Sequence, residues 1–397
     1  MGFLSHRIEE MTESATLAMA RKSRELKAKG LDIISLSLGE PDFDTPDFIK
    51  EAAVKAIHEN YTRYPPVNGY LDLREAISKK FNRDNKLNYS ADQIVVSTGA
   101  KQSIINAVLS LVNPGDEVII PTPFWVSYEE MVKLAEGKCV FIRAGIENDF
   151  KITPQQLEQA ITVKTKLMIF SSPCNPTGSV YTHEELVELS KVLKRNKNVY
   201  VIADEIYEHI NFTGKHASLA SIDGMYENVI TVNGVSKAFC MTGWRIGFIG
   251  APKTIADACN KLQGQFTSGA SSIAQRASLA AVQANPEVVK PMREAFLKRR
   301  DLVLKLLSEI SGLKSNVPQG AFYVFPEIKS FFGKSYDKFY IKTAEDLCMF
   351  LLEDALVALV TGEAFGDDNC IRISYAASEK ELIASMQRIK ISLAKLK

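Results

Sequence analysis

The residues best suited to do chemistry lie between Asn233 and Gly247. This stretch follows an apolar run, residues 229–232, that predicts a buried strand. Lys237 stands directly after Ser236, and Arg245 comes eight residues later. Burial of a lysine disfavours its ammonium form and lowers its pKa, and the neutral amine is the form that condenses with an aldehyde. Ser236 and Arg245 are suited to hold a phosphate, the arginine through two parallel hydrogen bonds.

One reactive amine beside a phosphate-binding pair is what the cofactor pyridoxal phosphate requires of a protein. The alternative is an exposed lysine next to a structural ion pair. This stretch alone does not decide between the two, because lysines with shifted pKa values mark functional sites only as a tendency.

A carboxylate occupies the corresponding place on another predicted strand. Residues 199–203 form a continuous apolar run that ends in Asp204. A buried carboxylate is costly unless it meets a cation. Asp204 and Lys237 are 33 residues apart, a spacing that suits neighbouring strands of one parallel sheet. Ligands of open α/β sheets bind at the carboxyl ends of such strands.

Four other residues are candidates for binding. Arg372 lies inside an apolar strand, residues 370–375, where an arginine needs a carboxylate. Gly39 ends a short predicted strand and allows close backbone approach, although a plain turn glycine is an equal alternative. Asn175 lies between two prolines in a loop in which an X-Pro bond can be cis, or it is a simple turn former. Trp125 is either a core residue or a flat surface for a ring.

The composition excludes several classes of function. The chain has 397 residues, 46% of them hydrophobic, and a net charge of +1, so nothing indicates nucleic acid or an anionic membrane as a partner. No apolar run approaches the roughly 20 residues of a membrane span, and no signal peptide is visible. The six cysteines are scattered, which favours reduced thiols in a cytoplasm, and no metal-ligand spacing is present. No Walker A or Gly-x-Gly-x-x-Gly motif indicates a nucleotide fold.

Strands and helices alternate from residue 93 onward, which predicts an α/β sheet. Before that point, residues 5–30 predict one charged helical segment with Ser14 and Thr16 in its path. We expect further helices at 47–60, 71–82, from 285–286 to about 310, near 343–354 and at 379–396, and another that follows the turn at 97–102 and carries apolar residues between 104 and 112. Strands are expected at 33–38, 94–96, 118–120, 167–170, 320–325 and 357–360.

Several short stretches in a consistent order and spacing extend over nearly the whole chain. They are residues 37–43, Tyr64 with Gly69, 97–101, Trp125, 175–178, 204–207, 236–237, 243–245 and 371–375. Together they resemble the class I pyridoxal-phosphate aminotransferases of fold type I, and they are most similar to the bacterial aspartate aminotransferase branch. Cys240 departs from the family's preference for Gly, Ser or Ala, which concerns packing beside the lysine loop and not the chemistry.

The resemblance implies the architecture and the assembly. A large cofactor-binding domain of mostly parallel sheet would span residues 45–290. A smaller α+β domain would combine residues 1–44 with 291–397. The protein would be a cytoplasmic homodimer with shared active sites, because Tyr64 of each subunit would reach the cofactor phosphate of the other.

The resemblance also implies roles for individual residues. Lys237 would hold the cofactor as a Schiff base and carry a proton to and from the substrate Cα. Asp204 would pair with the protonated pyridine nitrogen. Tyr207 and Asn175 would bind the phenolic oxygen of the ring, and Trp125 would stack on it. The remaining implied contacts are Ser236, Arg245, Ala100 and Lys101 with the phosphate, and Arg372 and Gly39 with the substrate α-carboxylate.

The implied reaction is exchange of the amino group between L-aspartate and 2-oxoglutarate by a ping-pong mechanism. Lys101, assisted by Ser14 and Thr16, would bind the distal carboxylate, because this branch lacks the arginine that other relatives use. The alternative is that Lys101 only supports the phosphate.

Other activities remain open at this stage. Prephenate or aromatic amino acids are the second choice of substrate. A carbon–sulfur lyase or decarboxylase on the same fold is a further alternative. A cofactor-binding regulatory domain is disfavoured because Lys237 is intact and no appended domain precedes the aminotransferase-like start.

Overall fold

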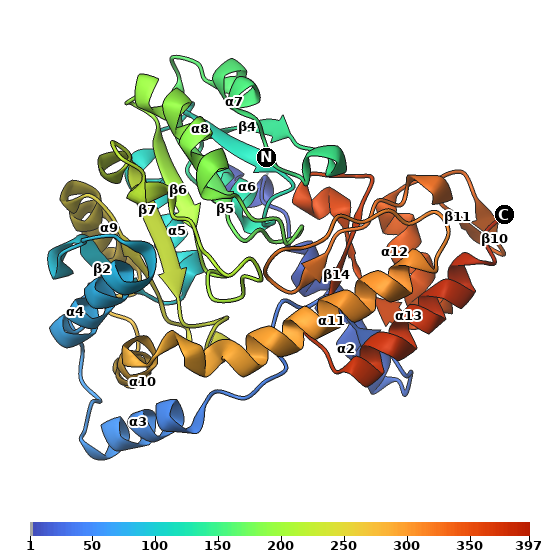
Figure 1. Ribbon diagram of the computed structural model, residues 1–397, viewed down its shortest axis with the longest axis horizontal. Coiled ribbons are helices and arrows are strands. Elements are labelled where there is room, and N and C mark those ends of the chain that lie inside the picture. The colour runs from blue at the N-terminus through green and yellow to red at the C-terminus, as the bar shows by residue number, and fades with distance from the viewer. Residues whose placement is uncertain (1–2) are drawn as a thin grey trace.

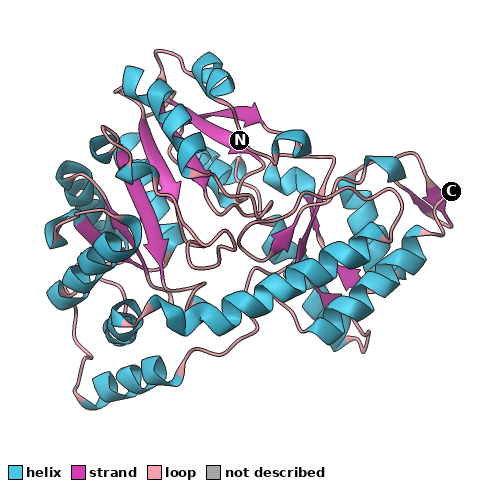
Figure 2. Ribbon diagram, viewed as in Figure 1, coloured by secondary structure: helices cyan, strands magenta, loops and turns pink. Residues whose placement is uncertain are grey.

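The computed structural model describes residues 3–397 and is organised around a seven-stranded sheet (Figures 1 and 2). The order across the sheet is β2-β8-β7-β6-β5-β3-β4. All neighbours from β7 to β4 run parallel, whereas β8 is antiparallel to both β2 and β7. The bounds are β2 Ile94–Ser97, β3 Glu117–Thr122, β4 Lys138–Arg143, β5 Thr165–Ser171, β6 Tyr200–Asp204, β7 Val229–Gly234 and β8 Gly247–Gly250.

Helices cover both faces of this sheet, which explains why its central strands are continuously apolar. Side chains alternate between the faces: Val201 and Ala203 of β6 join one core cluster, and Ile202 joins the other. The helices on the Ile202 side are α5 (Ala100–Leu111), α6 (Ser127–Leu134) and α9 (Lys253–Phe266), and those on the other side include α4 (Leu71–Lys80), α8 (His183–Arg195) and α10 (Ser272–Gln283).

A second group of elements joins the two ends of the chain. Strand β1 (Ile34–Ser35) pairs in parallel with β12 (Val357–Ala358), and β13 (Val360–Thr361), β14 (Ile371–Ser374) and β9 (Tyr323–Val324) form an antiparallel sheet. The long helix α11 (Lys290–Ser308) runs from the seven-stranded sheet to this group (Figure 1). The domain limits near residues 45 and 290 stay a prediction. The other elements of this group are α2 (Ala15–Ala28), β10 (Ser335–Tyr336), β11 (Phe339–Tyr340), α12 (Ala344–Asp354) and α13 (Glu379–Leu393).

Some predicted elements differ from the observed ones. Residues 5–30 are not one helix, because α1 (His6–Glu9) and α2 are separated by residues 10–14. Within that gap, the amide and hydroxyl of Thr12 donate to the Glu130 carboxylate at 3.0 and 2.9 Å, a distant contact that outweighs local helix propensity. The helix predicted at 71–82 ends at Lys80 and continues as a π-helical turn, Phe81–Asn85.

The predicted strands of the second group are too long. Residues 357–360 divide at Leu359, because Val357–Ala358 pairs with β1 whereas Val360 turns to pair with β14. The strands predicted at 33–38 and 320–325 shrink to two residues each. The remaining helices are α3 (Asp47–His58) and α7 (Pro154–Ala160). Within residues 3–397, no helix combines the length and the apolarity needed to cross a bilayer.

Candidate active site

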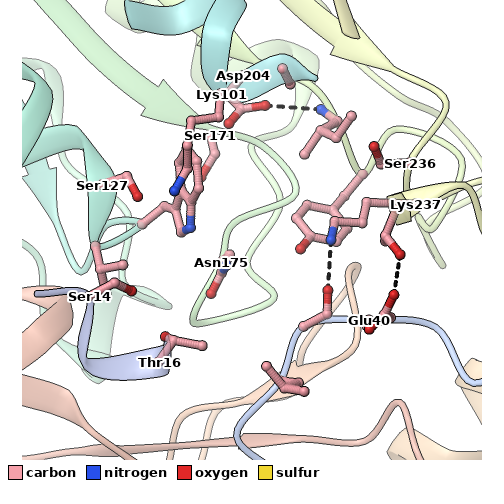
Figure 3. A pocket seen from close by; sticks show the side chains of 18 of the residues that line it. Ser14, Thr16, Glu40, Lys101, Ser127, Ser171, Asn175, Asp204, Ser236 and Lys237 are labelled. Atoms are coloured by element: carbon pink, nitrogen blue, oxygen red, sulfur yellow. Dashed lines mark hydrogen bonds between the residues drawn. The ribbon is translucent and has the colours of Figure 1, made fainter. Parts of the chain in front are cut away.

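A cavity of about 340 Å³ opens at the carboxyl ends of β6 and β7. Every site residue predicted from the sequence lines it, except Tyr64, whose side chain is 96% exposed elsewhere on this chain. Figure 3 shows residues from both parts of the molecule facing this space. The predicted residues that line it are Ser14, Thr16, Gly39, Ala100, Lys101, Trp125, Asn175, Asp204, Tyr207, Ser236, Lys237, Arg245 and Arg372.

Lys237 lies just beyond β7, and its Nζ donates to the carbonyl of Gly39 at 2.7 Å (Figure 3). Burial lowers the pKa of this amine to about 8. The Glu40 carboxylate opposes that change, whereas the positive charge of Arg245 adds to it. A substantial fraction of Lys237 is therefore neutral near pH 8, the state in which an amine attacks a carbonyl carbon.

Asp204 ends β6, and the alternation along the strand places it on the same face as Ile202. Tyr128 of α6 donates to its Oδ2 at 2.8 Å, and the amide of Ile206 donates to its Oδ1 at 3.2 Å. Burial raises the pKa of Asp204 to about 6 despite these donors. Among the described residues no salt bridge reaches this carboxylate, and the charge of Lys237 opposes the rise in its pKa only in part.

An anion-binding corner lies at the start of α5. Gly99 precedes the helix with φ 83°, and a Cβ there would lie 2.4 Å from Nη2 of Arg245. Arg245 itself is left-handed at φ 58°, and its Nη1 donates to the carbonyl of Thr242 at 3.0 Å. The helix N-terminus, the hydroxyl of Ser236 and the guanidinium together fit a phosphate group.

Arg372 of β14 is 1% exposed and meets no acid among the residues described. Its Nη1 donates to Oδ1 of Asn175 at 3.0 Å, and its Nη2 donates to the carbonyl of Ser37. The guanidinium lies 4.6 Å from the ring centre of Tyr323, and its Nε has no hydrogen-bond partner. Residues 3–397 therefore offer no carboxylate to this guanidinium, although an arginine in an apolar strand was expected to meet one.

Lys101, Ser14 and Thr16 belong to another wall of the cavity. The Nζ of Lys101 lies 5.0 Å from the ring centre of Trp125. Ser14 precedes α2 and Thr16 lies in its first turn, so both reach the cavity from the N-terminal segment (Figure 3). This wall contains one cation and two hydroxyls, which suits a polar or anionic substrate end.

Sequence reasoning missed two tyrosines that hold the predicted residues in place. Tyr128 binds Asp204, and its position one helical turn after Trp125 was the available signal. The hydroxyl of Tyr323 lies 2.8 Å from that of Tyr207, and no sequence motif marked it. Tyr323 also explains why residue 39 is a glycine, because a Cβ at that position would lie 2.0 Å from the Tyr323 hydroxyl oxygen.

Two further residues that the sequence analysis missed lie at the mouth of the cavity, and two features that it raised lie in the loops. Glu40 accepts a hydrogen bond from Thr242, and both line the cavity. The peptide bonds Ser172–Pro173 and Asn175–Pro176 are both cis, as the loop's prolines allowed. Cys240 has φ 52°, and its Sγ lies 3.3 Å from Sδ of Met292, so its departure from the family pattern concerns packing.

Comparisons with known proteins agree with this geometry. The family model "Aminotransferase class I and II" matches residues 31–389. A bifunctional aspartate aminotransferase and glutamate/aspartate-prephenate aminotransferase of Petunia hybrida is 49% identical over 99% of this chain and 83% of its own length. An aspartate/prephenate aminotransferase of Cereibacter sphaeroides is 47% identical over all of both chains.

Solved structures share both the sequence and the fold. The aspartate aminotransferase of Rhizobium meliloti has a TM-score of 0.96 and 43% identity over the whole of both chains. That of Thermus thermophilus with maleate has a TM-score of 0.93 and 39% identity over 99% of this chain and 100% of its own. The matching sequence and fold thus place the chain in the class I and II aminotransferases.

Proposed function

We propose that this aminotransferase uses pyridoxal phosphate to exchange the amino group between L-aspartate and 2-oxoglutarate, giving oxaloacetate and L-glutamate by a ping-pong mechanism. One observation carries the proposal. Two buried groups that have no salt bridge within residues 3–397, Arg372 and Asp204, line one cavity together with the amine of Lys237. Buried charges persist only when something neutralises them, so the cavity is built for a ligand with both signs of charge.

The residues present fit the cofactor at each of its polar ends. The α5 N-terminus, Ser236 and Arg245 offer donors to a phosphate. Asp204 offers a buried negative charge to a protonated pyridine nitrogen, which would remove the penalty that raises its pKa. Trp125 offers a flat surface to the ring. When bound, pyridoxal phosphate supplies an electron sink for the carbanion at the substrate Cα.

The protein's own groups would hold the substrate and move the proton. Arg372 would bind the α-carboxylate through two parallel hydrogen bonds, assisted by the backbone of Gly39. Lys237 would tether the cofactor through Nζ and, once released, carry the proton at the substrate Cα. Its lowered pKa supports this role, because an amine that titrates near the working pH both accepts and donates readily.

The choice of aspartate rests on the second wall of the cavity. Lys101 would bind the distal carboxylate, with Ser14 and Thr16 as supporting donors. The Thermus thermophilus relative was solved with maleate, a dicarboxylate of the same kind. Prephenate is the second candidate substrate, because relatives at 46–49% identity act on aspartate and prephenate according to their names.

We also propose a homodimer with shared active sites. Tyr64 is 96% exposed, and the nearby helix α3 exposes Phe48, Val54 and Ile57. Such an apolar surface is typical of a protein interface. If Tyr64 reaches the phosphate of a partner, Tyr64→Phe weakens cofactor retention, and a dissociated subunit loses activity.

A panel of amino donors assayed against 2-oxoglutarate and oxaloacetate tests the proposal. We expect a yellow purified protein with a visible band and the fastest exchange with aspartate. Release of pyruvate and ammonia without amino exchange would instead indicate a lyase. If prephenate reacts faster than oxaloacetate, prephenate and not oxaloacetate is the preferred amino acceptor.

A further inference from the structure

A second buried polar cluster adjoins the cavity from behind. It begins at Glu205, which follows Asp204 directly and is 2% exposed. Glu205 comes one residue after β6 ends, and its partners are not among the residues that line the cavity, whereas Asp204 lines it. Its carboxylate accepts three hydrogen bonds, from Ser218 Oγ at 2.7 Å, from His216 Nε2 at 2.9 Å and from Asn85 Nδ2 at 3.0 Å.

A lysine and a second carboxylate complete this cluster. Asn85 also donates to Glu208 at 2.8 Å and accepts from the ammonium of Lys80 at 2.8 Å. Lys80 forms an ion pair with Glu208, and both side chains are at least 96% buried. Burial works against the positive charge of His216, but the Glu205 carboxylate outweighs it and raises the pKa of the imidazole.

The cluster has the residue types of a metal site but not its geometry. Glu205, Glu208 and His216 gather closely enough to share an ion, and so do Asp84, Glu208 and His209. The space between the carboxylates is already used: the amide of Asn85 bridges Glu205 and Glu208, and Lys80 contacts Glu208. A metal would have to displace donors that already neutralise these acids, so we assign the cluster another role.

The backbone shows what the cluster holds. The amide of Glu208 donates to the carbonyl of Glu205 at 2.9 Å, which closes a turn over residues 205–208. This turn carries two groups that matter in the cavity: the amide of Ile206, bound to Asp204, and the side chain of Tyr207. Glu205 anchors the turn from the far side of the sheet.

We propose that Glu205 is a positioning residue, whose carboxylate, clamped by Asn85, His216 and Ser218, fixes the turn that orients Asp204 and Tyr207 toward the cofactor. The inference rests on the proposed roles of those two residues. A displacement of about 1 Å at a reacting group can cost about 100-fold in rate. A rigid support behind Asp204 and Tyr207 therefore contributes to catalysis without touching the substrate.

The variant Glu205→Gln tests the proposal, because it keeps the shape of the side chain but removes its charge. Its new NH₂ group would also face the donors of Asn85, His216 and Ser218, with which it cannot form the same hydrogen bonds. Glu117→Gln is the matched control. Glu117 is also a buried glutamate at a strand end, and it accepts a hydrogen bond from the Thr162 hydroxyl, but it begins β3 at the end of the sheet away from the cavity. Both holoenzymes are compared in thermal stability, kcat, KM and the pH titration of the visible cofactor band.

We expect both variants to lose thermal stability. Only Glu205→Gln should lower kcat, by about tenfold or more, with KM for aspartate within about twofold, and shift the pH midpoint of the cofactor band. If kcat and the midpoint of Glu205→Gln match those of the wild type, the positioning role is wrong. If Glu117→Gln changes them equally, the role is also wrong. Absence of amino exchange and of a visible band in the wild type itself would instead contradict the proposed function.

Discussion

Asp204 and Glu205 are neighbours in the chain, yet their side chains enter two buried clusters with opposite designs. On one face, Glu205 and Glu208 meet Lys80, His216 and Asn85, so that every charge has a partner within the protein. On the other face, the hydrogen-bond donors that Asp204 meets among residues 3–397 are neutral, the Tyr128 hydroxyl and the Ile206 amide.

The difference separates structural charge from functional charge. A paired buried ion already has its countercharge in the chain, whereas a buried ion without one is uncompensated and is therefore a candidate for binding a ligand. Burial alone, which both clusters share, would not distinguish them.

The largest expected effect comes from the amine of Lys237, which lines the cavity together with Asp204. Lys237→Ala should reduce amino exchange by at least about 10⁴-fold, since both covalent tethering and proton transfer are lost. Borohydride reduction followed by mass measurement checks the tether. Lys101→Gln is the control, because it should retain the reducible adduct. An unchanged adduct yield in Lys237→Ala would refute the assignment.

The next effect concerns the arginine without an acid. Arg372→Ala should raise KM for both amino-acid and oxo-acid substrates by about 100-fold, because two charge-assisted hydrogen bonds are lost. Cofactor retention, followed by the visible band during dialysis, should change little. Equal losses of substrate affinity and cofactor retention would contradict a role in binding the α-carboxylate.

A third substitution sharpens the contrast between the two clusters through stability. The pKa of Asp204 is raised from 3.8 to about 6, so the folded protein resists ionisation of this group. The resulting penalty is absent below about pH 4, grows as the pH rises, and reaches up to about 3 kcal/mol above about pH 6. Asp204→Asn should therefore stabilise the cofactor-free protein at pH 8 but not at pH 4, while crippling turnover.

Glu205→Gln provides the opposite case in the same unfolding assay. Because its charge is paired inside the chain, its loss should destabilise the cofactor-free protein by about 1–3 kcal/mol at pH 8. If Asp204→Asn and Glu205→Gln both stabilise the protein, or if neither does, the distinction between an uncompensated and a paired buried charge is wrong.

The contrast also explains what the sequence could and could not predict. Asp204 and Lys237 end two apolar runs, and β6 and β7 are indeed parallel neighbours, because strand ends and polar residues are local signals. The same local logic found Arg372 and the turn at Gly39. Tyr323 and the Glu205 clamp escaped prediction because their partners are brought together only by folding: Tyr323 meets Tyr207 across 116 positions, and Asn85 meets Glu205 across 120.

Some predicted ends of helices and strands were wrong for a related reason. The break after α1 depends on Thr12 and Glu130, and the split at Leu359 depends on two different partner strands. Neither contact leaves a pattern within its own segment, whereas the strands of the large sheet carry their apolar pattern within themselves.

The smallest expected effect tests the choice of substrate. Among the described residues that line the cavity, Lys101 is the cation that we assign to the same wall as Ser14 and Thr16, so its charge should matter only for donors with a distal carboxylate. We expect Lys101→Gln to raise KM about tenfold for aspartate, a change of about 1.4 kcal/mol, and to leave KM for a neutral donor such as phenylalanine nearly unchanged. Because the contact is partly open to solvent, the effect should weaken as salt rises. A uniform rise for all donors, with loss of cofactor, would mean that Lys101 supports the phosphate instead, and the preference for aspartate would need another source.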